Sequence, residues 1–280
     1  MKMKMLIPTD GSDNSNIALE YGLYIAPKFD ATIITGLHVI DVYLIQGPII
    51  TDISGAVGMP PYDGFFEAIE TSLNEKAQFI LKDFQQRCQK KGFAAEVKKT
   101  IGKIDQIIVE EAQKADVVLM AKKGEHFHLK EGGLLGSVAG AVIRHCGKPV
   151  MVTPEKFHEI ESMGIAYDGS EPAKKALKLS LEISSQAAWP LTVVIITADA
   201  EKADKLCTEA EELTEKYSTD CEIIILQGKE FEEILKFIQE GAVELMVMGA
   251  YGHNRLHELF LGSTTSNVIR KSSIPVLLIR

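Results

Sequence analysis

One unit occurs twice in this chain of 280 residues, and this repetition limits the fold more than any other feature of the sequence. The stretch "MLIPTDGSDNSNIAL", which begins at Met5, is matched by "IAYDGSEPAKKAL", which begins at Ile165. Further along, "LLGSVAGAVIRHCGKPVMV" from Leu134 is matched by "FLGSTTSNVIRKSSIPVLLI" from Phe260. Two copies of one α/β unit explain these matches better than a single large sheet does.

Each copy alternates apolar, β-branched runs with amphipathic stretches, which predicts strands that alternate with helices. The strands expected in the first copy cover residues 4–9, 32–41, 95–100, 117–121 and 149–153. Those expected in the second copy cover residues 164–167, 191–198, 222–226, 245–249 and 275–279. This order predicts an α/β fold of two tandem doubly wound parallel-sheet domains, flavodoxin- or Rossmann-like, with five strands each.

The repeat also predicts the domain boundaries. We expect a first domain at 1–154 with a long insertion at 43–65, a linker at 155–162 and a second domain at 163–280. Both copies end in a short apolar strand after a proline, "KPVMV" and "IPVLLI", and an exposed edge of this kind promotes aggregation unless it is paired. We therefore expect these edges to pair within the chain as an intramolecular pseudo-dimer. A homodimer through the insertion is the weaker alternative.

The composition limits the classes of partner that this protein is expected to bind. A formal net charge of −9 argues against broad binding of nucleic acid or anionic membrane, because both need a basic surface. No apolar run approaches the length of a membrane span, and the N-terminal stretch lacks the apolar core of a signal peptide, so we expect a soluble, cytoplasmic protein. The four cysteines form no C-x-x-C pair, and His253 and His257 lack a third ligand, so no metal site is predicted.

The second copy contains a glycine pattern that is typical of an anion site, Gly249-x2-Gly252-x9-Gly262-Ser263, where a predicted strand ends and a helix begins. Glycines allow a ligand to approach the backbone closely. The free N–H groups of a helix N-terminus favour phosphate, with the hydroxyls of Ser263 and Thr264 as further donors. The pattern is neither a Walker loop nor a G-x-G-x-x-G fingerprint, since both motifs are absent from the sequence.

Both halves resemble the universal stress protein family in its tandem two-domain form. The resemblance rests on the strand that ends in aspartate, on "LHVID" at 37–41, on the glycine motif and on the closing "VIRKSSIPVLLI". It implies an adenine-nucleotide site in the second copy. The residues expected at that site are Asp168, Thr197, Gly249, Gly252, His253, Gly262, Ser263 and Thr264.

The first copy departs from this pattern, so we expect weaker binding there. Ala121 replaces the first glycine, and eleven residues rather than nine separate the other two. The lysines at 122 and 123 would favour a phosphate by their charge. The residues expected at this weaker site are Asp10, Val39, Gly124, Gly136 and Ser137.

Two classes of function are open at this point. The first is a binding module whose occupancy by ATP or AMP regulates its shape or partners in a stress response. The second is a slow ATPase or nucleotidyl-handling enzyme on the same scaffold, for which Mg²⁺ could accompany the nucleotide. Efficient phosphoryl transfer needs a positioned metal, a group that orients water and stabilisation of transition-state charge. No local motif supplies a catalytic base, so we name no catalytic residue and favour binding.

Overall fold

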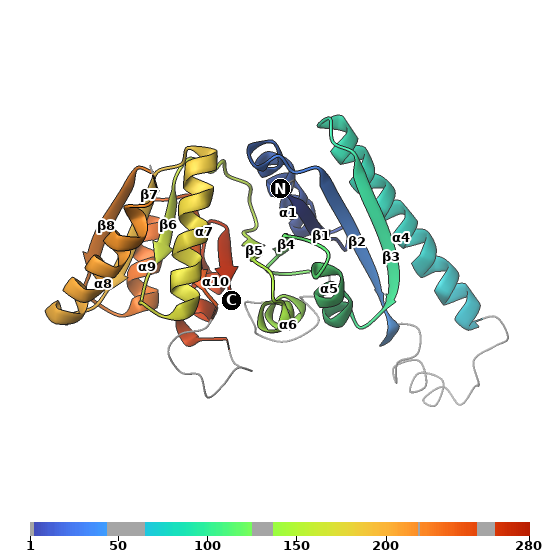
Figure 1. Cartoon of the computed structure of the whole chain (residues 1–280). Coiled ribbons are helices and arrows are strands. Elements are labelled where there is room, and N and C mark those ends of the chain that lie inside the picture. Colours follow the sequence, from blue (N-terminus) through green and yellow to red (C-terminus); the bar gives the residue numbers. More distant parts are fainter. Residues whose placement is uncertain (1–2, 44–64, 125–136, 218, 251–260) are drawn as a thin grey trace, which may run out of the picture.

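The computed structural model describes residues 3–43, 65–124, 137–217, 219–250 and 261–280. These residues form a ten-stranded sheet with the order β3-β2-β1-β4-β5-β10-β9-β6-β7-β8 (Figure 1). The strands are β1 (Lys4–Pro8), β2 (Ile33–Asp41), β3 (Ala95–Gly102), β4 (Val117–Ala121), β5 (Val150–Thr153), β6 (Met163–Ala166), β7 (Leu191–Ile196), β8 (Cys221–Leu226), β9 (Leu245–Gly249) and β10 (Val276–Ile279). The helices are α1 (Asp13–Ile25), the 3-10 helix η1 (Ala26–Phe29), α4 (Phe65–Lys90), α5 (Ile104–Ala112), α6 (Ser137–His145), α7 (Glu171–Ala187), α8 (Ala200–Thr214), α9 (Glu230–Gln239) and α10 (Ser263–Lys271).

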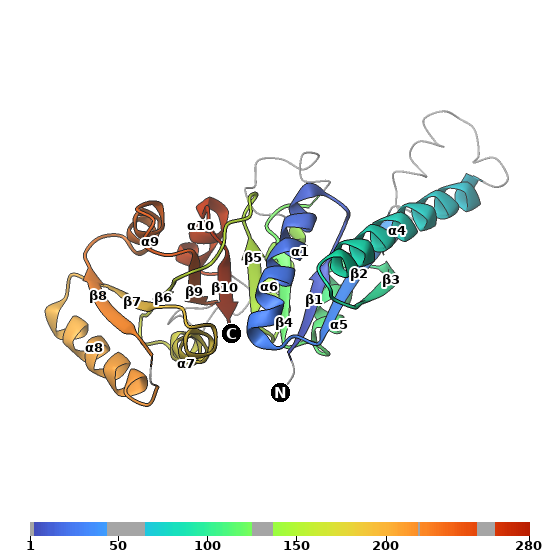
Figure 2. The same cartoon turned by 90° about the horizontal axis from the view of Figure 1, so that it is seen from above.

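The sheet consists of two doubly wound halves, which confirms the predicted fold class. In the first half the strand order reverses between β1 and β4, and in the second between β6 and β9. Central strands such as β4 and β10 are apolar and buried along nearly their whole length, as expected for parallel strands covered on both faces. The outer strands β3 and β8 are more exposed and more polar. In the second half, α7 and α8 cover one face of the sheet and α9 and α10 the other (Figure 2).

The two halves meet through their last strands. β5 and β10 pair antiparallel, with Met151 opposite Leu277, whereas every other neighbouring pair in the sheet is parallel. This pairing confirms the expected intramolecular pseudo-dimer. A buried apolar cluster on the face of α1 and α7 contains residues of both halves, and so does a second cluster on the face of α6 and α10.

Serine side chains cap the N-termini of two helices. The Ser12 hydroxyl accepts the Ser15 N–H at 3.2 Å and begins α1, and the Ser170 hydroxyl accepts the Ala173 N–H at 3.3 Å and begins α7. The long helix α4 carries an apolar stripe at three- and four-residue spacing. Its buried members are Ala77, Ile80, Phe84 and Cys88. Ile69 and Leu73, which continue the stripe toward the N-terminus of α4, are half-buried.

The predicted strands agree with the observed strands to within two residues. The largest differences are in two strands. β3 was expected to end at residue 100 but continues to Gly102, and β7 was expected to reach residue 198 but ends at Ile196. The chain turns there because the Thr197 hydroxyl accepts the Asp199 N–H at 3.2 Å, and the Asp199 carboxylate then accepts the Lys202 N–H to begin α8. The predicted insertion lies almost entirely outside the described residues.

The segment that joins β5 to β6 lies along α1. The Tyr24 hydroxyl donates to the Ile160 carbonyl at 2.9 Å and accepts the Ile160 N–H at 3.2 Å. The Tyr21 hydroxyl accepts the His158 N–H at 3.1 Å. The ring of Phe157 packs against both tyrosines, with centroid distances of 4.8 and 5.5 Å. The joining segment is therefore held to the first domain by its backbone and by an aromatic side chain.

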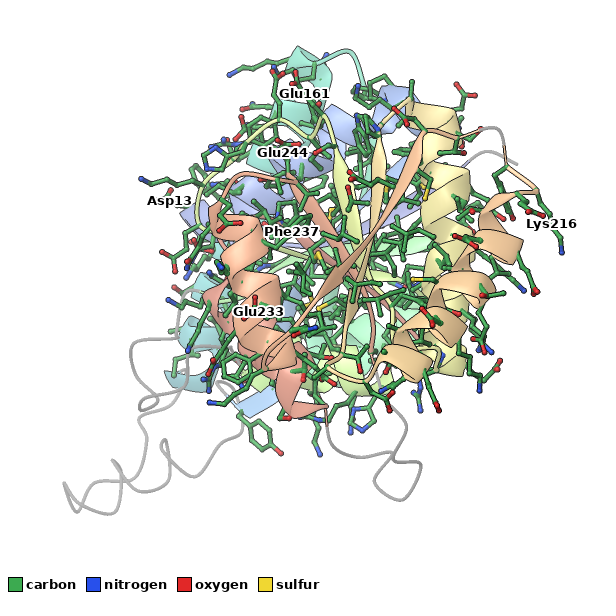
Figure 3. The ribbon with its side chains drawn as sticks, turned by 90° about the vertical axis from the view of Figure 1, so that its left-hand side faces the viewer. Asp13, Glu161, Lys216, Glu233, Phe237 and Glu244 are labelled. Atoms are coloured by element: carbon green, nitrogen blue, oxygen red, sulfur yellow. The ribbon has the colours of Figure 1, made fainter. Side chains whose placement is uncertain are left out.

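The same segment is held to the second domain where β6 begins. The Glu244 carboxylate accepts the backbone N–H of Ser162 at 2.8 Å and that of Glu161 at 3.4 Å (Figure 3). The hydroxyl of Ser162 donates to the same oxygen at 2.9 Å. Both ends of the connection thus have fixed partners, which helps to set the relative orientation of the domains.

Candidate functional site

The predicted site residues that are described gather at the carboxyl ends of the parallel strands. In the second domain Asp168 follows β6, Gly249 ends β9, and Gly262 precedes α10. The predicted residues Gly252 and His253, and Gly136 in the first domain, lie outside the described residues. This rim beside the switch in strand order is where doubly wound folds bind ligands.

The Asp-Gly-Ser turns have the same geometry in both domains. The Asp168 carboxylate accepts the Ser170 N–H at 2.9 Å, and the Asp10 carboxylate accepts the Ser12 N–H at 3.0 Å. The glycine between them has a φ of +78° in the second domain and +80° in the first, a conformation that few other residues adopt. Each carboxylate is thus oriented by its own backbone at the carboxyl end of the first strand of its domain.

Close packing within the second domain favours glycine at position 249. A Cβ on Gly249 would lie 3.0 Å from the backbone nitrogen of Ala173 and 3.0 Å from the Cβ of Pro172. The first turn of α7 therefore packs against the end of β9 too closely for a side chain. The sequence analysis explained this glycine by the approach of a ligand, and the packing of α7 is a second cause.

Gly262 differs from Gly249 because the described part of the chain does not require a glycine there. Its φ is −53°, and a Cβ would meet only the Thr265 hydroxyl oxygen, at 3.8 Å. No side chain caps the N-terminus of α10, among the described residues, whereas serines cap α1 and α7. The first turn of α10 therefore leaves backbone N–H groups for a ligand, with open space above Gly262.

The hydroxyls expected to assist at this helix have different surroundings. Ser263 is exposed at the start of α10 and suits the expected role. The Thr264 hydroxyl instead donates to the Glu230 carboxylate at 2.8 Å, so it is directed toward the first turn of α9. The Thr197 hydroxyl is an acceptor in the turn before α8. Because it only accepts there, the Thr197 hydroxyl can still donate its hydrogen to a ligand, whereas the Thr264 hydroxyl would have to leave Glu230 in order to donate.

The strand register corrects one correspondence between the two domains. Val39 in the first domain and Thr197 in the second were predicted, from the family resemblance, at corresponding positions of the two sites. In the sheet, however, Pro8 pairs with Leu37 and the matching Ala166 pairs with Val194, so the residue equivalent to Val39 is Ile196. Val39 and Ile196 are both half-buried against the same apolar cluster. A shift of one residue reverses the side of the sheet on which a side chain lies, so Thr197 and Val39 are not equivalent.

In the first domain the structure brings Asp10 and Gly124 together. A Cβ on Gly124 would lie 2.8 Å from a carboxylate oxygen of Asp10, so the loop after β4 closes onto this aspartate. Ser137, another predicted member of this site, begins α6. The lysines of the loop were expected near a phosphate, but Lys122 donates to the Ser272 carbonyl at 3.3 Å and Lys123 pairs with Glu155 at 2.8 Å.

Two cations link the helices of the predicted sites across the domain interface. Lys122 of the first domain donates to the carbonyl of Ser272, the C-cap of α10 in the second domain. Arg280 of the second domain donates to the carbonyl of Arg144, in the last turn of α6 in the first domain, at 3.1 Å. Burial lowers the pKa of Lys122. The sequence analysis missed both contacts, and no local signal reveals them, because the partners are 150 and 136 residues apart.

A buried histidine of β2, which contacts the backbone just after β1, was also missed. His38 lies within the quoted "LHVID", and its Nδ1 is 2.8 Å from the carbonyl oxygen of Thr9. The hydroxyl of Thr9 is in turn 3.2 Å from that of Ser15 in α1. This network supports the backbone immediately before Asp10. A histidine at an inward position of a strand was the signal that could have identified it.

Three further findings bear on the kind of site. Within the described ranges, no group of three or more His, Cys, Asp or Glu side chains could hold a metal ion. None of the described helices is long and apolar enough to cross a membrane. A cavity of about 390 Å³ lies at the amino ends of β1, β2 and β3, at the opposite end of these strands from Asp10. Its charged residues include Glu111, whose carboxylate pairs with both Lys98 and Lys114.

Two doubly wound domains, paired through their last strands and each with an Asp-Gly-Ser turn at its rim, define a tandem α/β protein with a candidate binding site in each half. A model of the universal stress protein family matches residues 1–154 and 194–280. Universal stress protein Slr1230 from Synechocystis sp. is 31% identical over 287 aligned residues, which cover 99% of each chain. The chain therefore belongs to the universal stress protein family.

Two more relatives show how far this likeness extends. Universal stress protein MJ0531 from Methanocaldococcus jannaschii is 36% identical over 158 residues, which cover 56% of this chain and 84% of that protein. The crystal structure of a universal stress protein from Archaeoglobus fulgidus has a TM-score of 0.76 at 24% identity and covers 99% of this chain and 96% of that chain. The second likeness shows a shared fold over both halves.

Proposed function

We propose that this protein binds an adenine nucleotide, ATP or AMP, at the rim of its second domain, and that occupancy regulates its shape or partners in a stress response. The observation that carries this proposal is the start of α10. Gly262 leaves open space over backbone N–H groups that no described side chain caps. A nucleotide phosphate fits this position because it is anionic and has several acceptor oxygens.

The other rim residues fit the remainder of a nucleotide. Asp168 is oriented by its own turn at the end of β6, and a carboxylate there can accept hydrogen bonds from a base or a ribose. In this proposal Gly249 and Gly252 bring the backbone close to the ligand, His253 and Ser263 lie beside the phosphates, and Thr264 joins them after it leaves Glu230. Two solved universal stress proteins are described in complexes with cAMP and dAMP. Those descriptions concern these two proteins, and the proposal for this chain rests on its own rim.

The first domain is proposed to bind the same ligand more weakly. Gly124, which follows β4, lies against Asp10, and Lys122 and Lys123 have partners in Ser272 and Glu155. A nucleotide at Asp10 would have to displace Gly124, whereas among the described residues only Thr265 lies within 4 Å of a Cβ at Gly262. The boundaries proposed for the two units are 1–154 and 163–280, with residues 155–162 as the linker.

Calorimetric titration with ATP, AMP and cAMP tests the proposal. Gly262→Val should weaken the tighter site about tenfold or more, because a branched side chain would fill the space above the helix N-terminus. Gly147→Val is the matched control, since Gly147 is exposed, lacks a positive φ and has nothing within 4 Å of its Cβ position. Unchanged affinity in Gly262→Val, with both variants folded by circular dichroism, would sink the assignment. Steady-state turnover with added Mg²⁺ separates this binding module from the alternative, a slow ATPase.

A further inference from the structure

A second cavity, of about 270 Å³, lies between the two domains on the face of the sheet that carries α1 and α7. Its lining includes Met151 of β5 and Leu277 of β10, which face each other across the antiparallel pair that joins the domains. Ile25 at the end of α1 lines it from the first domain, and Ile183 of α7 lines it from the second. The cavity therefore exists only because the two domains are paired, and it is separate from the residues proposed to bind nucleotide.

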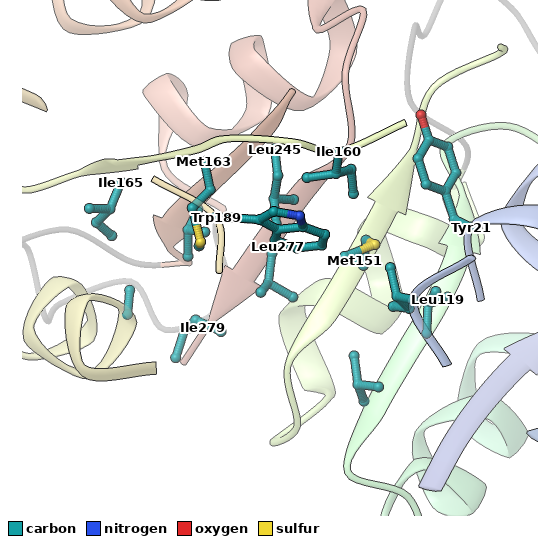
Figure 4. Close-up of a cluster of buried hydrophobic side chains, with 14 of the residues drawn as sticks. Tyr21, Leu119, Met151, Ile160, Met163, Ile165, Trp189, Leu245, Leu277 and Ile279 are labelled. Atoms are coloured by element: carbon teal, nitrogen blue, oxygen red, sulfur yellow. The ribbon is translucent and has the colours of Figure 1, made fainter. Parts of the chain in front are cut away.

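The interior of this cavity is apolar and partly aromatic. Trp189 and Phe29 line it, with ring centroids 6.1 Å apart and an interplanar angle of 72°. Figure 4 shows Trp189 among Leu245, Leu277 and Met151 in the buried cluster between the domains. An apolar ligand would be attracted by the burial of its own surface against these side chains.

The charged groups of the lining are acidic, and Gln186 adds an uncharged polar side chain. Asp116 and Glu182 both line the cavity, and none of its described lining residues is a lysine, arginine or histidine. The Asp116 carboxylate accepts the backbone N–H of Lys4 at 2.8 Å. The cation of Lys28 lies near the cavity but is placed over aromatic rings, 5.2 Å from the centroid of Tyr24 and 5.5 Å from that of Trp189. The lining itself thus favours a positively charged group.

Comparison of α1 with α7 shows that the residues of α7 that line the cavity differ from their equivalents in α1. Leu179 and Glu182 follow the capping Ser170 by the same number of residues as Tyr21 and Tyr24 follow the capping Ser12. The two tyrosines of α1 bind the backbone of the segment between the domains. At the equivalent positions of α7, a leucine and a carboxylate line the cavity instead.

We propose that this cavity is a second binding site, for a small primary amine with an apolar body. The ammonium group would lie at Glu182, at the exposed rim, and the apolar body would lie against Trp189, Leu179 and Ile183. The volume is slightly below the range of about 300–1,000 Å³ that is usual for small-molecule sites, so the ligand is a short chain or a single ring. This proposal does not depend on nucleotide binding.

Trp189 provides a direct reporter, because it is the only tryptophan in the chain. Octylammonium, 1-octanol and octanoate carry the same hydrocarbon chain with a positive, a neutral and a negative head group. Octylammonium should change the Trp189 emission saturably and bind about three- to fivefold more tightly than the other two, as expected for one partly exposed ion pair. Glu182→Gln should abolish this preference, whereas Glu212→Gln, at an exposed position of α8, should retain it.

A variant that fills the cavity supplies the second test. Leu179→Phe should weaken the binding of all three probes. Leu213→Phe should not, because Leu213 is also half-buried but lies on α8, away from the cavity lining. Thermal unfolding establishes that both variants are folded. The proposal is wrong if no probe changes the Trp189 emission saturably, if the three head groups bind equally, or if Leu179→Phe leaves the binding unchanged. Gly262→Val should leave amine binding unaltered, so failure of the nucleotide proposal would be seen separately.

Discussion

Two glycines of one motif, Gly249 and Gly262, have different roles in this protein. The α-carbon of Gly249 lies against the backbone of α7, so a side chain there would have to displace the first turn of that helix. Gly262 has open space and an ordinary φ, so the described structure would accept a side chain. The motif therefore combines one requirement of folding with one that we assign to the ligand. The presence of Ala121 in the first domain is consequently not, by itself, evidence that nucleotide binding is lost there.

Gly249→Ala should destabilise the second domain even without nucleotide. The added methyl group would lie 3.0 Å from the Ala173 nitrogen and from the Pro172 Cβ, so α7 must shift. Such overpacking costs about 1–3 kcal/mol of the free energy of unfolding. Urea denaturation followed by far-ultraviolet circular dichroism measures this loss. Gly147→Ala, at an open position, should change the free energy by less than about 0.5 kcal/mol, and an equally small change in Gly249→Ala would contradict the packing argument.

At the scale of elements, the apolar pattern predicted the strands because each strand depends on nearby residues. It predicted the pairing of β5 with β10 because each half ends in an apolar edge strand that needs a partner. It could not predict the register of β2 and β7. Each domain has a left-handed residue before its second strand, Asp30 in the first and Ala188 in the second, at the same spacing from the aspartate. The shift of one residue therefore arises in the pairing of the strands, which the spacing in the sequence does not show. The partners of Lys122 and Thr264 were also beyond prediction, since each depends on the tertiary approach of another element.

The segment between the domains should loosen when its tyrosine partner is removed. Tyr24→Phe deletes the hydroxyl that both donates to and accepts from the backbone of Ile160. Two hydrogen bonds of this kind contribute about 1–3 kcal/mol in total, so amide exchange at Ile160 should be faster. Hydrogen exchange followed by mass spectrometry or NMR measures this rate. Tyr43→Phe, at an exposed tyrosine, is the control, and unchanged protection of Ile160 in Tyr24→Phe would refute the role of α1 as its anchor.

At the scale of the whole molecule, the two domains complete each other. The antiparallel pair of β5 and β10 removes two sheet edges, and one apolar cluster runs through both halves. In addition, each domain places a cation at the C-terminal end of a helix in the other domain whose N-terminus lies at a predicted site. Lys122 lies at the end of α10, and Arg280 lies at the end of α6. The pairing of domains thereby stabilises the same helices that we propose to hold phosphate.

Lys122→Met should therefore weaken α10, although Lys122 belongs to the other domain. A cation at a helix C-terminus contributes about 0.3–1 kcal/mol at the surface and up to about 2 kcal/mol when partly buried. Burial lowers the pKa of Lys122, which shows that desolvation offsets part of this gain, so we expect a loss near 1 kcal/mol. Amide exchange at Val268 and Ile269 should be about fivefold faster, since a difference of 1.4 kcal/mol corresponds to tenfold.

The matched control for this prediction is Lys123→Met, which removes the ion pair with Glu155. It should leave the exchange of α10 unchanged. Arg280→Met should have the same effect on the other domain. It should accelerate exchange at Val142 and Ile143 of α6, because Arg280 donates to the last turn of that helix. If Lys122→Met changed the amide exchange only of residues in the first domain, the cation would stabilise its own domain and not α10. The reciprocal stabilisation of the two helices would then be wrong.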